Sequence, residues 1–365
     1  MKHGLQDLRV IDFTSGIAGP YCTKLLADAG AEVIKVESDA GDPLRRWTAG
    51  DTELPPGEDG ALFRFLNASK QSLVGTPEST RVGELVDSSD LVVDDFRPTQ
   101  VDVLESLISG SCVRLSITPF GRGGPWNRRP ATEFTLQAES GSIGSRGIPG
   151  REPFQAGGRI TDWLGGTFGA VAALAAVHRA QATGHGEHID FSLLEVMTYA
   201  SSNYLDLSFR LLGVENPTGS IQSAETPSIE PTADGFVGFC TNSAQQFSDF
   251  LLLIERADLR DDKTLFNVGS RAARFDEWNQ IVHRYTREHS TEQIVRAASL
   301  LRIPVAPVNN GDTVRSHTQL AARGVFQAEP EGSALHPVPP YRIDGQRPAA
   351  PRRAPKLGEH TDSIA

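Results

Sequence analysis

The sequence contains few of the residues that cross-link small secreted proteins. Its 365 residues include only three cysteines, Cys22, Cys112 and Cys240, and no two of them have C-x-x-C spacing. These separations exclude a disulfide scaffold and a thiolate zinc site, and they are typical of a reducing compartment. The H-x-x-H pair of His185 and His188 is flanked by glycines that disfavour a helical ligand pair, so no metal site is expected.

Long apolar runs and an excess of basic charge are also missing. Residues 1–7 contain no apolar signal region, and the most apolar run, residues 164–177, is too short to span a bilayer. The chain has 35 basic and 46 acidic residues, and its net charge of −11 would repel nucleic acid and anionic membrane surfaces. We therefore expect a cytoplasmic protein that binds neither nucleic acid nor membranes.

The composition is that of an ordinary globular protein, with 39% hydrophobic residues. Along the sequence, segments typical of strands alternate with segments typical of helices. At about 150 residues per domain, the length predicts about two domains. In the first half, strands are predicted over 8–13, 32–37, 72–75, 91–96, 112–117 and 187–191, and helices over 21–29, 82–86, 101–108, 161–182 and 192–212. This alternation predicts an α/β fold with a mainly parallel sheet that is covered on both faces.

The second half begins with a change in composition. Residues 213–234 are rich in Pro, Ser, Thr and Glu and show little periodicity, which predicts a linker. A second α/β block follows, with strands over 236–240 and 303–308 and helices over 244–254, 275–289 and 291–301. The tail from Pro337 onward is rich in Pro and Arg, and we expect it to lie along a surface rather than to form a new core.

The first β–α turn, residues 14–20, has two glycines before a helix, so its backbone N–H groups are suited to approach by a phosphate. The turn lacks the G-x-G-x-x-G fingerprint of dinucleotide-binding proteins and the Walker pattern, and a purely structural turn explains it as well. The missing fingerprint argues against an NAD-dependent dehydrogenase. No G-x-S-x-G motif for a nucleophilic serine occurs.

Asp162 lies at the start of the long predicted helix. An aspartate in a first helical turn is favoured by the exposed N–H groups and the macrodipole, so capping alone explains it. The same place also suits chemistry, because helix-start N–H groups hold a carboxylate ionised and the small residues that follow leave room for a ligand. The residues alone leave both interpretations open.

Segments spread over nearly the whole chain match the pattern of one family in order. They are L-R-V-I-D-F at 8–13, A-G-P at 18–20, L-L-A-D-A-G-A-E-V-I-K-V-E at 25–37, F-R-P at 96–98, G-P at 124–125, Asp162 before the long helix, G-H-G-E-H-I-D at 184–190, I-P-V-A-P-V at 303–308 and P-K-L-G-E-H-T at 355–361. In these features the chain resembles the class III coenzyme A transferases, also called the CaiB/BaiF family.

The resemblance implies a Rossmann-like large domain built from both chain ends, a smaller α/β domain, and an interlocked homodimer. We accordingly divide the chain into a large domain over 1–212 to which 320–365 return, a linker over 213–234 and a small domain over 235–319. It also implies that coenzyme A is a substrate rather than a permanently bound cofactor, and that it moves between an acyl-CoA donor and a carboxylic acid through a covalent intermediate on the catalytic Asp162. The implied coenzyme A contacts are Gly16, Ile17, Ala18, Arg45, Arg46, Lys70, Asp95, Phe96 and Arg97.

Departures from the family pattern leave two alternatives open. Ile17, Ser38, Gln71 and Asp95 replace residues that family members often use around the coenzyme, which removes two cations and adds a carboxylate. A non-catalytic partner subunit is therefore one alternative. The other is a 2-methylacyl-CoA racemase or epimerase of the same fold, although Thr132 stands where racemases carry a histidine base, and only the neighbouring Glu133 is able to abstract a proton.

Overall fold

The chain divides into two compact units in the computed structural model. The structure describes residues 4–98, 102–144, 146–147, 151–201, 224–225, 227–329, 334–348 and 350–364. The large unit comprises Met1–Ser145, Phe154–Asn216 and Ala322–Ala365, and the small unit comprises Arg146–Pro153 and Pro217–Ala321.

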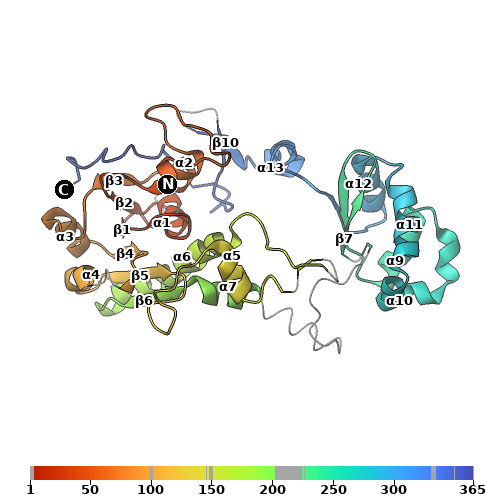
Figure 1. The fold of residues 1–365 in the computed structure, drawn as a ribbon. Coiled ribbons are helices and arrows are strands. Elements are labelled where there is room, and N and C mark those ends of the chain that lie inside the picture. The colour runs from red at the N-terminus through yellow and green to blue at the C-terminus, as the bar shows by residue number, and fades with distance from the viewer. Residues whose placement is uncertain are drawn as a thin grey trace. The chain divides into compact units, whose positions relative to one another are not determined.

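The large unit is built around a six-stranded parallel sheet (Figure 1). Its strands are β1 (Arg9–Asp12), β2 (Glu32–Glu37), β3 (Gln71–Val74), β4 (Leu91–Asp94), β5 (Val113–Thr118) and β6 (His188–Ser192). They lie in the order β3-β2-β1-β4-β5-β6, and every neighbouring pair is parallel. The predicted α/β class with a parallel sheet is confirmed. Because the order reverses between β1 and β4, the carboxyl ends of these two strands form the crevice where such sheets bind ligands.

Helices cover both faces of this sheet, which explains the apolar strand sequences. Val10, Val33 and Val93 belong to the core formed with α1 (Ala18–Asp28) and α6 (Ile160–Thr183). Their neighbours Ile11, Ile34 and Val92 belong to the opposite core. That second core includes residues of α3 (Thr80–Asp87) and α4 (Asp102–Leu107), which lie across the sheet from α1 and α6 (Figure 1).

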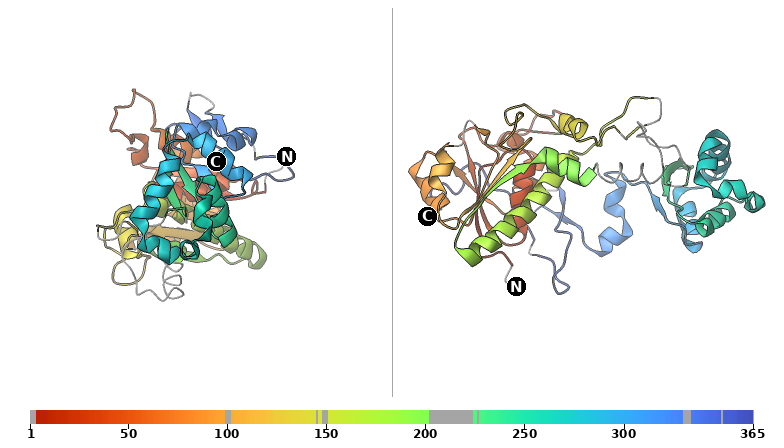
Figure 2. Two further views of the ribbon diagram at one scale, coloured as in Figure 1. Left: turned by 90° about the vertical axis from the view of Figure 1, so that its right-hand side faces the viewer. Right: turned by 90° about the horizontal axis from the view of Figure 1, so that it is seen from below.

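Glycines allow α6 to pack closely on its neighbours. A Cβ atom on Gly166 would lie 2.7 Å from the carbonyl oxygen of Ala18, and one on Gly165 would lie 2.3 Å from Leu193 Cδ2. The helix runs along the face of the sheet (Figure 2). By length and composition α6 also passes the test for a membrane-spanning helix, but its buried residues pack in the same core as α1 and the strands.

Shorter elements complete the large unit. They are η1 (Pro43–Arg45), α2 (Ala61–Leu66), α5 (Glu133–Glu139), α7 (Leu193–Ser201), β10 (Phe326–Ala328) and β11 (Leu335–Pro337), while α13 (Thr318–Ala322) lies at the boundary between the units. The helix predicted over 192–212 corresponds to α7 as far as Ser201, and the rest of that prediction lies outside the described residues.

The C-terminal tail lies along the free edge of β3. His360 N donates to Ser72 O over 3.0 Å, and Val74 N donates to Thr361 Oγ1 over 3.0 Å. The tail thus protects an edge strand, and Ile364 adds one side chain to the core beneath it. The expectation that the tail lies along a surface is met.

The small unit contains a three-stranded antiparallel sheet covered by helices. The strands are β7 (Ser228–Pro231), β8 (Phe236–Phe239) and β9 (Val305–Pro307), in that order. The helices are α9 (Ala244–Leu253), η3 (Ala257–Asp261), η4 (Lys263–Phe266), α10 (Val268–Ala273), α11 (Phe275–Thr286), α12 (Thr291–Leu300) and η5 (Thr313–Ser316). Phe250 and Trp278 lie in its core.

Strand β7 corrects the predicted linker over 213–234, because Ser228–Pro231 pair with β8. The buried side chain of β7 is Glu230, whose Oε2 lies 2.7 Å from His283 Nε2. A strand that buries a carboxylate against a histidine shows no apolar alternation, so its sequence resembled a loop. Residues 213–223 and 226 of the predicted linker lie outside the described residues.

Candidate active site

The end of β1 organises the turn that leads into α1. Asp12 is fully buried, and its Oδ1 accepts hydrogen bonds from Thr14 N (2.9 Å) and Thr14 Oγ1 (2.5 Å). Its Oδ2 accepts from Thr23 Oγ1 (2.6 Å) and Lys70 Nζ (3.0 Å). Burial alone would raise the pKa of Asp12, but the ammonium groups of Lys70 and Lys35 outweigh it and hold this pKa well below its usual range.

The turn itself meets the end of β4 at the reversal point of the sheet. Ser15 donates from N (2.8 Å) and from Oγ (3.0 Å) to Asp95 Oδ2. Gly16 follows with a φ of 71°, a left-handed conformation that favours glycine. Ile17 is the N-cap of α1, and no side chain of the described residues caps this helix start. Because Pro20 has no N–H, the groups at this helix start that suit an anionic ligand are the N–H groups of Ala18 and Gly19.

Six of the nine expected coenzyme contacts come together here. Gly16, Ile17 and Ala18 form the turn, and Asp95, Phe96 and Arg97 directly follow β4. The Phe96 ring packs 5.8 Å from the ring of Phe13 at the end of β1. Burial raises the pKa of Asp95 to about 6, although its hydrogen bonds from Ser15 lower it.

Asp162 lies in the first turn of α6 and is held by Arg159. Arg159 donates from Nε (2.7 Å) and Nη2 (2.6 Å) to Asp162 Oδ2. Among the described residues no donor reaches Oδ1. The Asp162 side chain is only 13% exposed, and this burial raises its pKa. Arg159 lowers the same pKa, and the nearby carboxylate of Glu133 raises it. Asp162 thus presents one engaged oxygen and one oxygen without a donor.

The hydrogen-bonding cap at the start of α6 comes from Glu133 of α5 rather than from Asp162. Glu133 Oε1 accepts from Thr161 N over 2.9 Å and from Thr161 Oγ1 over 3.0 Å. Arg159 is the N-cap residue, in a left-handed conformation, and its side chain makes no capping hydrogen bond. The expected helix-start N–H groups around the Asp162 carboxylate are replaced by the Arg159 guanidinium.

Close packing brings Asp162 next to the turn before α1. The ring of Trp163 meets the ring of Tyr21 edge-on at 4.7 Å. Gly166 lies against the backbone of Ala18 and is four residues, or about 6 Å of helix, from Asp162. The carboxylate and the anion-suited turn therefore occupy neighbouring helix starts within the large unit.

Arg45 and Lys70, two of the expected coenzyme contacts, are engaged by other groups of the protein. All five donors of the buried Arg45 guanidinium point to Glu37, Asp59 or the carbonyl oxygen of Pro355. The buried Lys70 ammonium group contacts Asp12, Pro20 O, Thr23 Oγ1 and Asn67 Oδ1, and burial lowers its pKa to about 8. Neither residue has a donor left for a phosphate, so both hold the site together from within.

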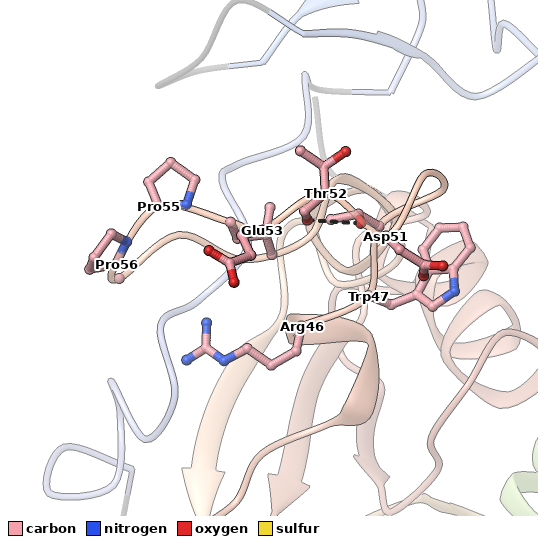
Figure 3. Close-up of a pocket in the computed structure, with 10 residues that line it drawn as sticks. Arg46, Trp47, Asp51, Thr52, Glu53, Pro55 and Pro56 are labelled. Atoms are coloured by element: carbon pink, nitrogen blue, oxygen red, sulfur yellow. Dashed lines mark hydrogen bonds between the residues drawn. The ribbon is translucent and has the colours of Figure 1, made fainter.

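Arg46 remains accessible. It is exposed and lines a pocket of about 570 Å³ together with Trp47 and residues of the loop 48–57. Figure 3 shows the Arg46 side chain extending on the same side as Glu53, away from Trp47. Arg46 Nη1 donates to the carbonyl oxygen of Glu58, which leaves most of its donors for other partners.

The residues that stand where racemases carry their bases have structural partners. Thr132 is the N-cap of α5 and forms a capping box with Thr135. Glu133 is engaged by Thr161 and by Gln137. Within the described ranges no group of three or more His, Cys, Asp or Glu residues is placed to hold a metal ion. His188 instead contacts Ser116 Oγ at 2.9 Å from Nε2.

The large unit thus combines a doubly wound sheet, a helix start at its reversal point that no described side chain caps, and a neighbouring carboxylate. The model of CoA-transferase family III matches residues 5–361, and the chain belongs to this family. The predicted family and the predicted CoA-transferase class are confirmed.

Two relatives and one solved structure illustrate the match. The chain is 30% identical to the succinate–glutarate CoA-transferase of Agrobacterium fabrum, over 100% of this chain and 95% of that protein. It is 28% identical to subunit BbsE of the succinyl-CoA:(R)-benzylsuccinate CoA-transferase of Thauera aromatica, over 100% of this chain and 94% of that protein. Its fold is similar to that of a CaiB/BaiF family protein from Brucella suis, with a TM-score of 0.88, 25% identity, and coverage of 100% and 99% of the two chains.

Proposed function

We propose that this chain transfers coenzyme A from a succinyl-CoA-like donor to a carboxylic acid through a covalent intermediate on Asp162. The observation that carries the proposal is the Asp162 carboxylate, with Oδ1 without a donor beside the turn that precedes α1. The names of the two relatives support a dicarboxylic donor, because both proteins are named for succinate or its CoA thioester.

The exchange needs no net proton transfer. Asp162 Oδ1 attacks the thioester carbonyl carbon, the C–S bond breaks, and a mixed anhydride and the coenzyme A thiolate form. The thiolate attacks the Asp162 carbonyl carbon, the C–O bond breaks, and the donor acid leaves as a carboxylate. The acceptor carboxylate then attacks the aspartyl-CoA thioester, and the same two steps in reverse release the new acyl-CoA and restore Asp162.

Coenzyme A acts here as a substrate, and no permanently bound cofactor takes part. We place its phosphates near the turn formed by Gly16, Ile17 and Ala18, whose N–H groups lack a side-chain cap. Arg46 supplies an accessible guanidinium on the loop after β2. Asp95 lies at the same place and adds a negative charge, so it weakens rather than strengthens the binding of an anion.

The surface of α6 and α7 supports a homodimer. Val171 is 65% exposed and Tyr199 is 71% exposed, and the Tyr199 ring packs edge-on against Phe168. A second copy of the chain that covers these side chains removes apolar surface from water. Sedimentation at nanomolar concentration tests this, since a monomer of full helical content would contradict an interlocked pair.

The proposed location is the cytoplasm.

A racemase is disfavoured, because Thr132 and Glu133 serve the starts of α5 and α6. Deuterium exchange at the α-carbon of 2-methylacyl-CoA that persists in Asp162→Asn would reverse this conclusion. A partner subunit remains the other alternative, since one relative is named as a subunit.

The test of the proposal uses the purified chain alone. Labelled succinate should enter the succinyl-CoA pool without any second protein, and Asp162→Ala should abolish this exchange while the protein stays folded. The wild-type chain alone could instead show no exchange over a panel of acyl-CoA donors and regain exchange when a second subunit is added. That result would assign the activity to a heteromeric enzyme.

A further inference from the structure

Arg159 was not among the site residues expected from the sequence. Its backbone lies in the left-handed region, with φ 59° and ψ 47°, which costs a non-glycine residue about 1 kcal/mol or more. Its side chain makes no capping hydrogen bond, is 56% exposed, and places both Nε and Nη2 on one oxygen of Asp162. Among the described residues, Asp162 is the residue with which the Arg159 guanidinium forms hydrogen bonds and an ion pair.

The charge on Asp162 disappears during the proposed reaction. A free Asp162 is an anion, whereas Asp162 in the aspartyl-CoA thioester is neutral, because the negative charge has left with the donor acid. The departing carboxylate separates from the Asp162 carbonyl carbon itself, next to the oxygen that Arg159 contacts. A guanidinium on a long, exposed side chain is able to follow that charge without any movement of the backbone.

We infer that Arg159 is a counter-ion that alternates between two carboxylates: it pairs with Asp162 in the free enzyme, and it binds the reacting carboxylate of the substrate acid while Asp162 is held as the coenzyme A thioester. This inference rests on the proposed transfer through Asp162. It makes Arg159 the group that receives the acceptor acid in the covalent intermediate.

The direct test measures the binding of a free acid by titration calorimetry, which needs no turnover. In the wild-type chain Asp162 occupies Arg159, so succinate should bind weakly. Asp162→Asn imitates the neutral Asp162 of the thioester intermediate and frees the guanidinium, so succinate should bind about fivefold more tightly, as expected for one partly exposed ion pair. The double variant Arg159→Gln/Asp162→Asn should lose this gain.

A matched control separates a specific contact from a general change in charge. Arg179 lies near the other end of α6, is 59% exposed and pairs with Glu187. Arg179→Gln/Asp162→Asn carries the same net charge as the test double variant and should keep the fivefold gain. If Arg159→Gln/Asp162→Asn also keeps the gain, Arg159 does not bind the acid and the inference is wrong.

A monocarboxylate identifies which carboxylate is bound. Butyrate has the chain length of succinate and one carboxylate, and it should show the same gain in Asp162→Asn. A gain confined to succinate would contradict the inference, because it would show that Arg159 holds the second, unreactive carboxylate. In steady state, Arg159→Gln should raise the KM for the acceptor acid about fivefold and leave the KM for acyl-CoA nearly unchanged, and Arg159→Lys should restore part of the loss.

These results also distinguish the inference from the function on which it rests. If the wild-type chain forms an adduct on Asp162 but the calorimetric gain survives without Arg159, only the inference fails. If Asp162→Ala still forms the adduct, the proposed function fails, whatever the binding measurements show.

Discussion

The contact between α6 and α1 sets the position of Asp162, and a single methyl group at Gly166 should disturb it. In Gly166→Ala the new Cβ would lie 2.7 Å from Ala18 O and 3.0 Å from Cys22 N, both of which are backbone atoms that cannot rotate away. Overpacking of this kind costs about 1–3 kcal/mol, and the better helix propensity of alanine returns about 1 kcal/mol. The net loss of stability should be about 1 kcal/mol.

The larger effect should fall on activity. The two helices must separate by several tenths of an ångström, and Asp162 is one helical turn from the point of contact. Displacements approaching 1 Å at a reacting group cost up to about 10²-fold in rate, so kcat/KM for CoA transfer should fall by about 10-fold or more. Transfer assays and urea unfolding on the same preparation measure the two effects separately.

Gly169→Ala is the matched control on the same helix. Its Cβ would meet Ile117 Cδ1 at 3.4 Å and Cys22 Sγ at 3.6 Å, which are ordinary contacts. This variant should gain up to about 1 kcal/mol of stability from helix propensity and keep its activity. Wild-type kcat/KM in Gly166→Ala, or an equal loss in both variants, would refute the account of how the site is positioned.

Three further predictions concern charged groups of the site. Lys70→Met should destabilise the protein by about 3–5 kcal/mol, measured by urea unfolding at neutral pH, because it removes the direct ion-pair partner of the buried Asp12; the deficit should shrink as acid protonates Asp12. Glu133→Gln should move the acidic limb of the pH–rate profile to lower pH, since the Glu133 charge raises the pKa of Asp162 and only the ionised carboxylate attacks. Asp95 has a pKa of about 6, so the wild-type KM for acyl-CoA should rise between pH 5 and pH 7 as Asp95 ionises near the coenzyme phosphates. Asp95→Asn should show a constant KM over this range, and a rise of KM that persists in this variant would contradict the prediction.

The strands of the large unit were predictable because they are buried on both faces. Runs such as Val33, Ile34 and Leu91–Val93 are apolar at consecutive positions, and this pattern together with the intervening helices is sufficient to predict a parallel sheet. Asp162 was also predictable as a candidate, because the periodicity of the long helix locates its start. The small unit was less predictable at β7, where the buried side chain is a glutamate.

The partners of the charged residues were not predictable, because they come from distant segments. Arg45 is enclosed by Glu37, Asp59 and the backbone of Pro355, and the last of these is 310 residues away. Glu133 reaches the start of α6 from 28 residues away and takes the capping role that Asp162 was able to fill. Arg159 lies only three residues before Asp162, so the spacing in G-G-R-I-T-D was the available signal for this ion pair.

The mass of the intact protein after incubation with succinyl-CoA tests the central claim most directly. The account predicts a coenzyme A adduct that hydroxylamine removes, which leaves an Asp162 hydroxamate in the peptide that contains the start of α6. Neither Asp162→Ala nor freshly purified Asp162→Asn should carry the adduct, while both keep the wild-type fold. An adduct of normal yield on Asp162→Ala, or a modified peptide from another part of the chain, would contradict the account.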